Sequence, residues 1–206
     1  MTMNKEFPPR TRCATGALFL LMSVVLPSLS SAQEVPVFQI TPLQSSIKFD
    51  VEASVEIKGT FDQWTARLTF PSPDVTTATI DVEIQAASVD TGSGLKNSKL
   101  KSSDFFDVDN NPLITFKSTK VVQTGPDTFE LDGNFTIRGV SKAEKLALTV
   151  SGRGTGTGLI KGTMAFDRKD YGMNSGIPFI KIADRVEVIV SLRATRVAGP
   201  PVVFKQ

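Results

Sequence analysis

Strict alternation of apolar and polar residues constrains the fold of this chain more than any other feature. Between Ser46 and Lys58 every odd-numbered residue is apolar and every even-numbered residue is polar. A period of two places the apolar side chains on one face of an extended strand and the polar side chains on the other. The run is longer than an ordinary strand, so we expect a bend or break near Ala53 and Ser54.

The same pattern returns along the rest of the chain. Further alternating segments lie at residues 66–70, 80–86, 114–118, 129–138, 146–150, 164–166 and 185–194. Turn signals such as Pro71-Ser72-Pro73-Asp74 and the glycine-rich stretch from Gly152 to Gly158 separate them. Alternation with one wet face favours antiparallel strands, and about eight of them predict an all-β sandwich or a closed barrel. The pattern alone does not choose between these two.

One segment has no period of two. Residues 94–103 contain two leucines and three lysines, which predict a short helix with Ser93 as its cap. Phe105 and Phe106 follow directly. In an extended chain their rings point to opposite sides, so we expect one of them to close the core from its end.

The first 32 residues predict a cleavable signal peptide. A basic start is followed by the uncharged apolar run from Ala14 to Leu26, and small residues then lead to a cleavage site after Ala32. The alternative is a membrane anchor. The run has 13 residues, whereas crossing a bilayer takes roughly 20, so we expect cleavage and a periplasmic or secreted protein without a stable membrane span.

Removing the leader changes the composition. The whole chain has 23 basic and 21 acidic residues, and the leader holds three basic and one acidic residue, which leaves 20 of each. The leader also holds the single cysteine, Cys13. A neutral mature chain offers no electrostatic footprint for nucleic acid, and a chain without cysteine has no thiol chemistry. We expect one domain at residues 33–196 and a tail at residues 197–206.

The chain contains no histidine. This excludes a Ser-His-Asp triad and most zinc sites. The acidic residues fall mostly on the polar faces of strands or in turns, where solvation is their ordinary role. We therefore predict a protein that is not an enzyme and that has no metal site and no cofactor.

Several segments, in order, resemble the YceI-like family of exported lipid-binding proteins. They include Gln44–Phe49, Gly59-Thr60-Phe61, Leu100–Asp107, Pro112–Ser118, Gly133–Val140, Phe166–Gly172 and Ala183–Val188. The resemblance implies a single antiparallel lipocalin-like β-barrel that binds a polyisoprenoid, such as an isoprenoid quinone or a prenyl phosphate, or another long-chain lipid. Many members carry histidines near the positions of Gln44 and Lys99, so no histidine role is transferred.

The inward apolar positions are rich in phenylalanine. Such a lining suits a prenyl chain, because a prenyl chain binds through apolar contact area and not through hydrogen bonds. The candidates for an apolar tunnel are Phe49, Phe61, Trp64, Phe70, Phe105, Phe116, Phe135, Met164 and Phe166. The alternative is that these side chains simply fill the core. Near a mouth of the barrel, the head-group candidates are Arg138, Arg168 and Tyr171, with a turn-stabilising role as the alternative.

Three functions compete at this point. The first is an exported carrier or binding protein for a long apolar amphiphile. The second is a structural or interaction barrel with a filled core. The third is a carboxylate-dependent hydrolase, which needs acidic side chains inside the cavity. A homodimer is compatible with each of them.

Overall fold

The computed structural model describes residues 34–205 except 55, 177 and 178, together with Thr2. The described residues within the range 33–206 form one compact unit. Apart from Thr2, the predicted leader lies outside the described residues, so the signal peptide and its cleavage after Ala32 stay predictions. Within the described part of the chain, no helix is long and apolar enough to cross a membrane.

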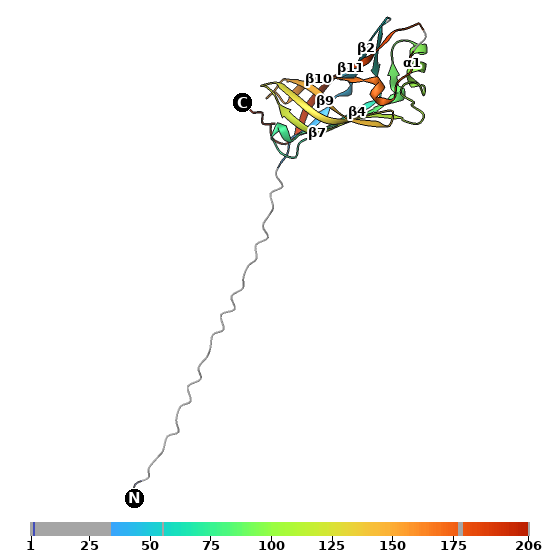
Figure 1. The fold of residues 1–206 in the computed structure, drawn as a ribbon. Coiled ribbons are helices and arrows are strands. Elements are labelled where there is room, and N and C mark those ends of the chain that lie inside the picture. Colours follow the sequence, from blue (N-terminus) through green and yellow to red (C-terminus); the bar gives the residue numbers. More distant parts are fainter. Residues whose placement is uncertain (1, 3–33, 55, 177–178, 206) are drawn as a thin grey trace. The chain divides into compact units, whose positions relative to one another are not determined.

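The chain forms a closed antiparallel β-barrel of eight strands with one α-helix among the described residues (Figure 1). This confirms the predicted all-β barrel. Short interruptions divide the ring into β1 (Val37–Ile40), β2 (Ser46–Ala53), β3 (Ile57–Phe61), β4 (Trp64–Thr69), β5 (Thr79–Gln85), β6 (Val89–Asp90), β7 (Leu113–Gln123), β8 (Thr128–Ile137), β9 (Val140–Ser151), β10 (Thr157–Asp167) and β11 (Ile182–Ala198).

The pairing explains why these segments make an eight-stranded ring. The hydrogen-bonded order is β1-β4-β5-β7-β8-β9-β10-β11-β2-β3-β6, and β1 also pairs with β11, which closes the barrel. Strands β1 and β2 follow one another along the same edge of β11. Strand β3 then pairs with β2, and β4 with β1, so each of these consecutive pairs occupies one position in the ring.

Because neighbouring strands are antiparallel, the connections gather at two ends. The helix end holds α1 (Gly94–Lys101), the β2–β3 turn and the segment after the 3₁₀ turn η4 (Arg168–Tyr171). The tail end holds η2 (Val75–Thr77), the glycine-rich β9–β10 turn and the residues after β11. Two further 3₁₀ turns, η1 (Pro42–Gln44) and η3 (Ala86–Ser88), interrupt the wall.

The alternation seen in the sequence sets which side chains face inward. The expected break near Ala53 is confirmed, since β2 ends there and β3 begins at Ile57. In β8 every second residue from Phe129 to Ile137 is buried. Ile189, which interrupts the alternation of the last strand, lies on the outer face and is 39% exposed.

The helix prediction is confirmed for residues 94–101, although the cap differs. Ser93 occupies the N-cap position, but its hydroxyl makes no capping bond. The side chain of Asn97 instead accepts a hydrogen bond of 2.9 Å from the main-chain N–H of Thr91. Phe105 and Phe106 are both buried, contrary to the expectation of one inward ring, because this segment is a tight turn and not an extended strand.

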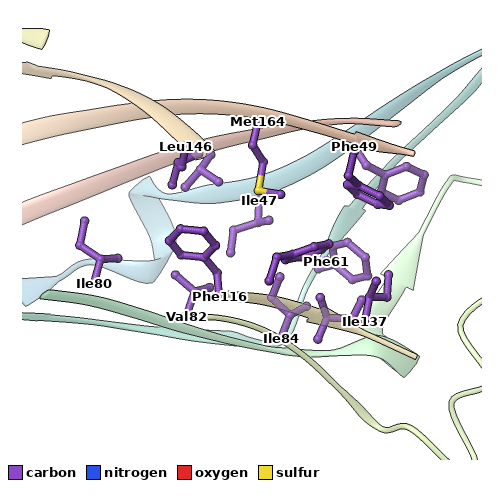
Figure 2. Packing of buried hydrophobic residues seen from close by; sticks show 14 of the residues in the cluster. Ile47, Phe49, Phe61, Ile80, Val82, Ile84, Phe116, Ile137, Leu146 and Met164 are labelled. Atoms are coloured by element: carbon purple, nitrogen blue, oxygen red, sulfur yellow. The ribbon is translucent and has the colours of Figure 1, made fainter. Parts of the chain in front are cut away.

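The interior is a single cluster of buried apolar side chains from all walls of the barrel. Figure 2 shows Ile47 from β2 and Phe116 from β7 pointing into it from different strands. Strand β11 continues to Ala198, two residues beyond the predicted domain boundary at residue 196. The residues after it pack back onto the tail end, and Val202 and Phe204 touch the core.

Candidate functional site

The barrel interior is not completely filled. At the helix end lies a cavity of about 100 Å³, the helix-end cavity, lined by residues of β2, β3, β8 and β11 and by Phe105 and Phe106. The atoms that face it are apolar. Its volume is several times the roughly 10–15 Å³ that one water molecule needs, and an apolar space of this kind stays dry and takes up apolar molecules.

Two more cavities continue along the barrel. The middle cavity, of about 40 Å³, shares Ile47, Ile84, Phe135 and Val188 with the helix-end cavity. The tail-end cavity, of about 110 Å³, shares Ile80, Leu148 and Ile160 with the middle one. Because each neighbouring pair of cavities is separated only by side chains that border both, the three lie in series from one end of the barrel to the other.

Most of the predicted tunnel residues border these cavities. Phe49, Phe61, Phe105, Phe135 and Phe166 line the helix-end cavity. Phe116 and Met164 line the middle cavity, together with Phe135. Phe70 lines the tail-end cavity. Trp64 borders none of the three; it is half-buried and packs against the core.

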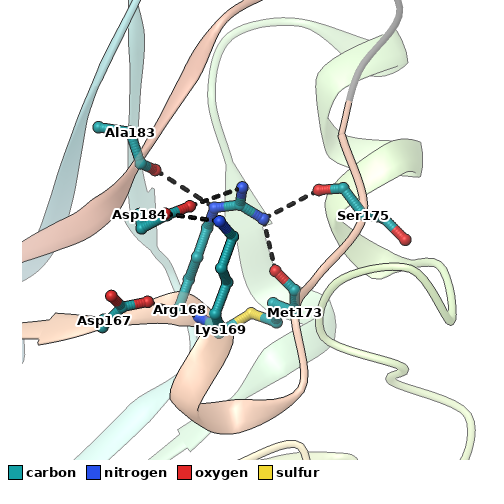
Figure 3. Close-up of polar contacts among 7 residues, drawn as sticks. All are labelled: Asp167, Arg168, Lys169, Met173, Ser175, Ala183 and Asp184. Carbon is teal, nitrogen blue, oxygen red and sulfur yellow. Dashed lines mark hydrogen bonds and ion pairs between the residues drawn. The ribbon is translucent and has the colours of Figure 1, made fainter.

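Arg168, a predicted head-group residue, borders the helix-end cavity, but its guanidinium is held by the protein itself (Figure 3). It donates to the carbonyl oxygens of Met173, Ser175 (2.9 Å) and Ala183 (3.2 Å) and to a carboxylate oxygen of Asp184 (3.0 Å). Its side chain is only 8% exposed. These bonds join η4, the segment that follows it and the start of β11.

The carboxylate of Asp184 also forms an ion pair with the ammonium of Lys169, at 2.7 Å. The hydrogen bond from Lys169 holds the pKa of this carboxyl below its ordinary value, and the charge of Arg168 acts in the same direction. The Asp184 side chain is 36% exposed, so solvent screens these charges and the pair with Lys169 adds little to stability.

The two other head-group candidates also have partners inside the protein. Arg138 donates to the carbonyl oxygens of Gly172 and Ser103, and thereby ties the β8–β9 turn to two loops at the helix end. Tyr171 is completely buried between the rings of Phe135 and Phe166. Its hydroxyl donates to Glu144 at 2.8 Å, and burial together with this carboxylate raises the pKa of the phenol. These contacts favour the turn-stabilising role.

Comparison with known proteins identifies the family. The model of the YceI-like domain matches residues 38–194, most of the described chain. The chain belongs to the YceI-like family. A UPF0312 protein of Azotobacter vinelandii is 29% identical over 144 residues, which cover 67% of this chain and 73% of that protein. A UPF0312 protein of Ectopseudomonas mendocina is 27% identical over 143 residues, covering 67% and 74%.

Solved structures share the fold of this YceI-like barrel. Burkholderia cenocepacia BcnA superposes with a TM-score of 0.69 at 23% identity, covering 76% of this chain and all of that one. A polyisoprenoid binding domain from Saccharophagus degradans, described as implicated in plant cell wall breakdown, superposes with a TM-score of 0.62 at 14% identity. It covers 78% of this chain and 99% of that one. At these identities the likeness shows the fold alone.

The YceI-like barrel also presents two cations that the sequence did not single out as site residues. Lys96 and Lys99 of α1 both border the helix-end cavity. Lys96 donates to the main-chain carbonyl of Glu56 at 2.7 Å, and Lys99 pairs with Asp104 while its ammonium lies 5.9 Å from the centre of the Phe105 ring. Residues three apart share one face of a helix, and this spacing was the available signal.

Proposed function

We propose that this chain is an exported carrier or binding protein that holds a long apolar amphiphile of the polyisoprenoid class, such as an isoprenoid quinone or a prenyl phosphate, inside its barrel. The observation that carries the proposal is the series of three cavities along the interior, two with a wholly apolar lining and one with a mainly apolar lining. The predicted leader supports export, and family membership together with a structural neighbour described as a polyisoprenoid binding domain supports the ligand class.

The lining suits a prenyl chain energetically. Each methylene transferred from water to an apolar site contributes about 0.8 kcal/mol, so ten buried carbons contribute about 8 kcal/mol before the costs of ordering. The phenylalanine rings supply this contact without polar atoms that would need partners. A barrel with a fully packed core, the structural alternative, has no need of three bordering cavities.

We place the polar head of the ligand at the helix end. Lys96 lies at this mouth, and its ammonium donates to a main-chain carbonyl and makes no ion pair among the described residues. Lys99 shares Asp104 with the hydroxyl of Ser175, which lies 3.1 Å from the other carboxylate oxygen. An anionic or carbonyl-bearing head group would find in Lys96 an ammonium with three donors, one of which is used among the described residues.

The lining also argues against catalysis by carboxylates. No aspartate or glutamate borders any of the three cavities formed by the described residues. A hydrolase of the kind considered from the sequence needs a paired acid and base beside its substrate. Binding without chemistry is therefore the function that this interior supports best.

Two adjacent residues of β11 provide the test. Val188 borders both the helix-end and the middle cavity, and Ile189 lies on the outer face of the same strand. Val188→Trp fills the interior at the junction of two cavities, and Ile189→Trp adds the same ring outside. Native mass spectrometry of protein purified from its own exported compartment should show a bound prenyl-type mass in the wild type and in Ile189→Trp, and much less of it in Val188→Trp. Equal lipid content in both variants, or none in the wild type, would contradict the proposal.

A further inference from the structure

We propose that residues 199–205, the C-terminal strap, close the tail end of the barrel, and that Phe204 sets the length of apolar chain that the interior accepts. This inference rests on the proposed function and adds a specificity-determining residue to it. The strap follows β11 and lies outside residues 38–194, which the family model matches. The length limit would therefore be a property of this chain's own terminal segment.

The strap begins with a turn that requires glycine. Gly199 has a φ of +76°, in the left-handed region that residues with a Cβ rarely adopt. A Cβ at this position would lie 1.9 Å from the carbonyl oxygen of Val35. The chain can thus leave the last strand and turn across the end of the barrel only with glycine here.

Main-chain bonds then fix the strap to other walls of the barrel. The N–H of Val203 donates to the carbonyl of Pro73 at 2.7 Å, and its carbonyl accepts from the N–H of Val75 at 3.0 Å. The side-chain amide of Gln123 at the end of β7 both donates to the carbonyl of Lys205 and accepts from its N–H, at 2.9 and 2.8 Å. The strap therefore spans from β11 past η2 to β7.

Alternation within the strap turns two apolar side chains toward the interior. Val202 and Phe204 line the tail-end cavity, while Val203 points outward and is 59% exposed. The Phe204 ring meets Phe129 edge-on at 6.1 Å between ring centres. The guanidinium carbon of Arg153, from the glycine-rich turn, lies 5.0 Å from the centre of the same ring.

Both cations that border the tail-end cavity already have partners in the protein. Arg153 forms an ion pair of 2.5 Å with Asp127, and Arg196 donates to the carbonyl of Gly199 at 2.5 Å. The lining of the tail-end cavity is mainly apolar. A prenyl chain with its head at the helix end would run through the three cavities and meet Phe204 with its terminal methyl groups.

A length series of prenols tests this reading. In the wild type, affinity for geraniol, farnesol, geranylgeraniol and longer prenols should rise with each added prenyl unit until the chain reaches Phe204, and then level off or fall. Phe204→Ala should move this optimum to a chain one unit longer and strengthen binding of that prenol at least tenfold. Val203→Ala, which removes an outward side chain from the same strap, should leave the optimum unchanged. An optimum that Phe204→Ala does not move would overturn the inference while leaving the proposed function intact.

A second measurement needs no ligand. Cys13 is the only cysteine of the chain, so in a Cys13→Ser background a single thiol introduced by Val121→Cys reports on the tail-end cavity that Val121 borders. This thiol should resist N-ethylmaleimide, and adding Phe204→Ala should speed its reaction at least tenfold. Equal rates would show that the strap does not close the barrel. A protected thiol in a protein that binds no prenol of any length would refute the proposed function and still support the closure.

Discussion

Replacing Arg168 by leucine distinguishes a structural guanidinium from a ligand-binding one. The Arg168 side chain is 8% exposed, and leucine has none of its hydrogen-bond donors. Three carbonyl oxygens, those of Met173, Ser175 and Ala183, would lose their donor. A buried acceptor without its donor costs about 1–3 kcal/mol. The bond to Met173 is buried, and the bonds to Ser175 and Ala183 are half-buried and cost less. Asp184 keeps its ion pair with Lys169 and is partly exposed, so losing its bond to Arg168 adds little to the cost. We expect a loss of about 3–4 kcal/mol in the free energy of unfolding.

Urea unfolding measures this loss, with Trp64, the single tryptophan of the chain, as the fluorescent probe. For a domain of this size, 1 kcal/mol corresponds to about 2–4 °C in Tm, so Arg168→Leu should melt roughly 6–16 °C lower. The matched control is Lys169→Leu, which removes the neighbouring exposed partner of the same carboxylate and should cost at most about 1 kcal/mol. If Arg168→Leu stayed within 1 kcal/mol of the wild type and lost its ligand, Arg168 would be a head-group residue and the reasoning from its hydrogen bonds would be wrong.

Two further predictions concern Tyr171 and the packing around Gly133. In an alkaline titration followed by ultraviolet absorbance, Tyr171, the single tyrosine, should ionise only as the protein unfolds, because burial and Glu144 raise its pKa above the ordinary 10.0. Folding stability should then fall as pH rises past about 10, since only the unfolded chain loses this proton there; ionisation near pH 10 with unchanged circular dichroism would contradict this. Gly133→Ala should destabilise the fold by about 1–3 kcal/mol, because its Cβ would lie 2.5 Å from the Phe116 ring. Gly94→Ala in α1, with nothing within 4 Å, should be neutral or stabilising by up to about 1 kcal/mol, and the reverse order in chemical denaturation would refute the packing argument.

The strands could be predicted because one physical rule controls them. A wall with an apolar inner face and a wet outer face leaves a period of two in the sequence, and the burial of β2 and β8 follows it closely. Even the exception, Ile189, marked a residue that the structure places outside. The alternation within single strands did not distinguish a barrel from a sandwich, because closure depends on the pairing of β1 with both β4 and β11. The family resemblance predicted the barrel.

The polar residues could be located but not interpreted. The sequence placed Arg168 near a mouth of the barrel, where it lies, yet three of its four acceptors are main-chain carbonyls. Every residue has such a carbonyl, so the residue types of a loop do not predict that its carbonyl oxygens will surround a guanidinium. The lysines of α1 were part of a recognised helix, but their position at the cavity depends on how that helix packs.

Whether an inward ring fills the core or borders a cavity depends on the register between strands. Phe116 pairs with Phe135 across β7 and β8, and its ring also reaches over Gly133, where a Cβ would collide with it. On the next pair of strands, β9 and β10, Leu148 covers Gly162 in the same way. These glycines leave room for a side chain from the next strand. Single-strand patterns do not contain this information.

The strap and α1, which lie at opposite ends of the barrel, are held with different strength, and this bears on how a ligand would enter. At the tail end the strap is tied by main-chain bonds to Pro73 and Val75 and by a two-way amide bond to Gln123. At the helix end α1 buries only Leu100, and Leu95 on the same helix is 87% exposed. A segment with few buried contacts opens at lower free energy than one tied by main-chain bonds, so exchange of a bound chain would proceed past α1 while the loops joined by Arg138 and Arg168 stay in place. The head group would then enter last and leave first, beside Lys96 and Lys99, while the far end of the chain rests against Phe204.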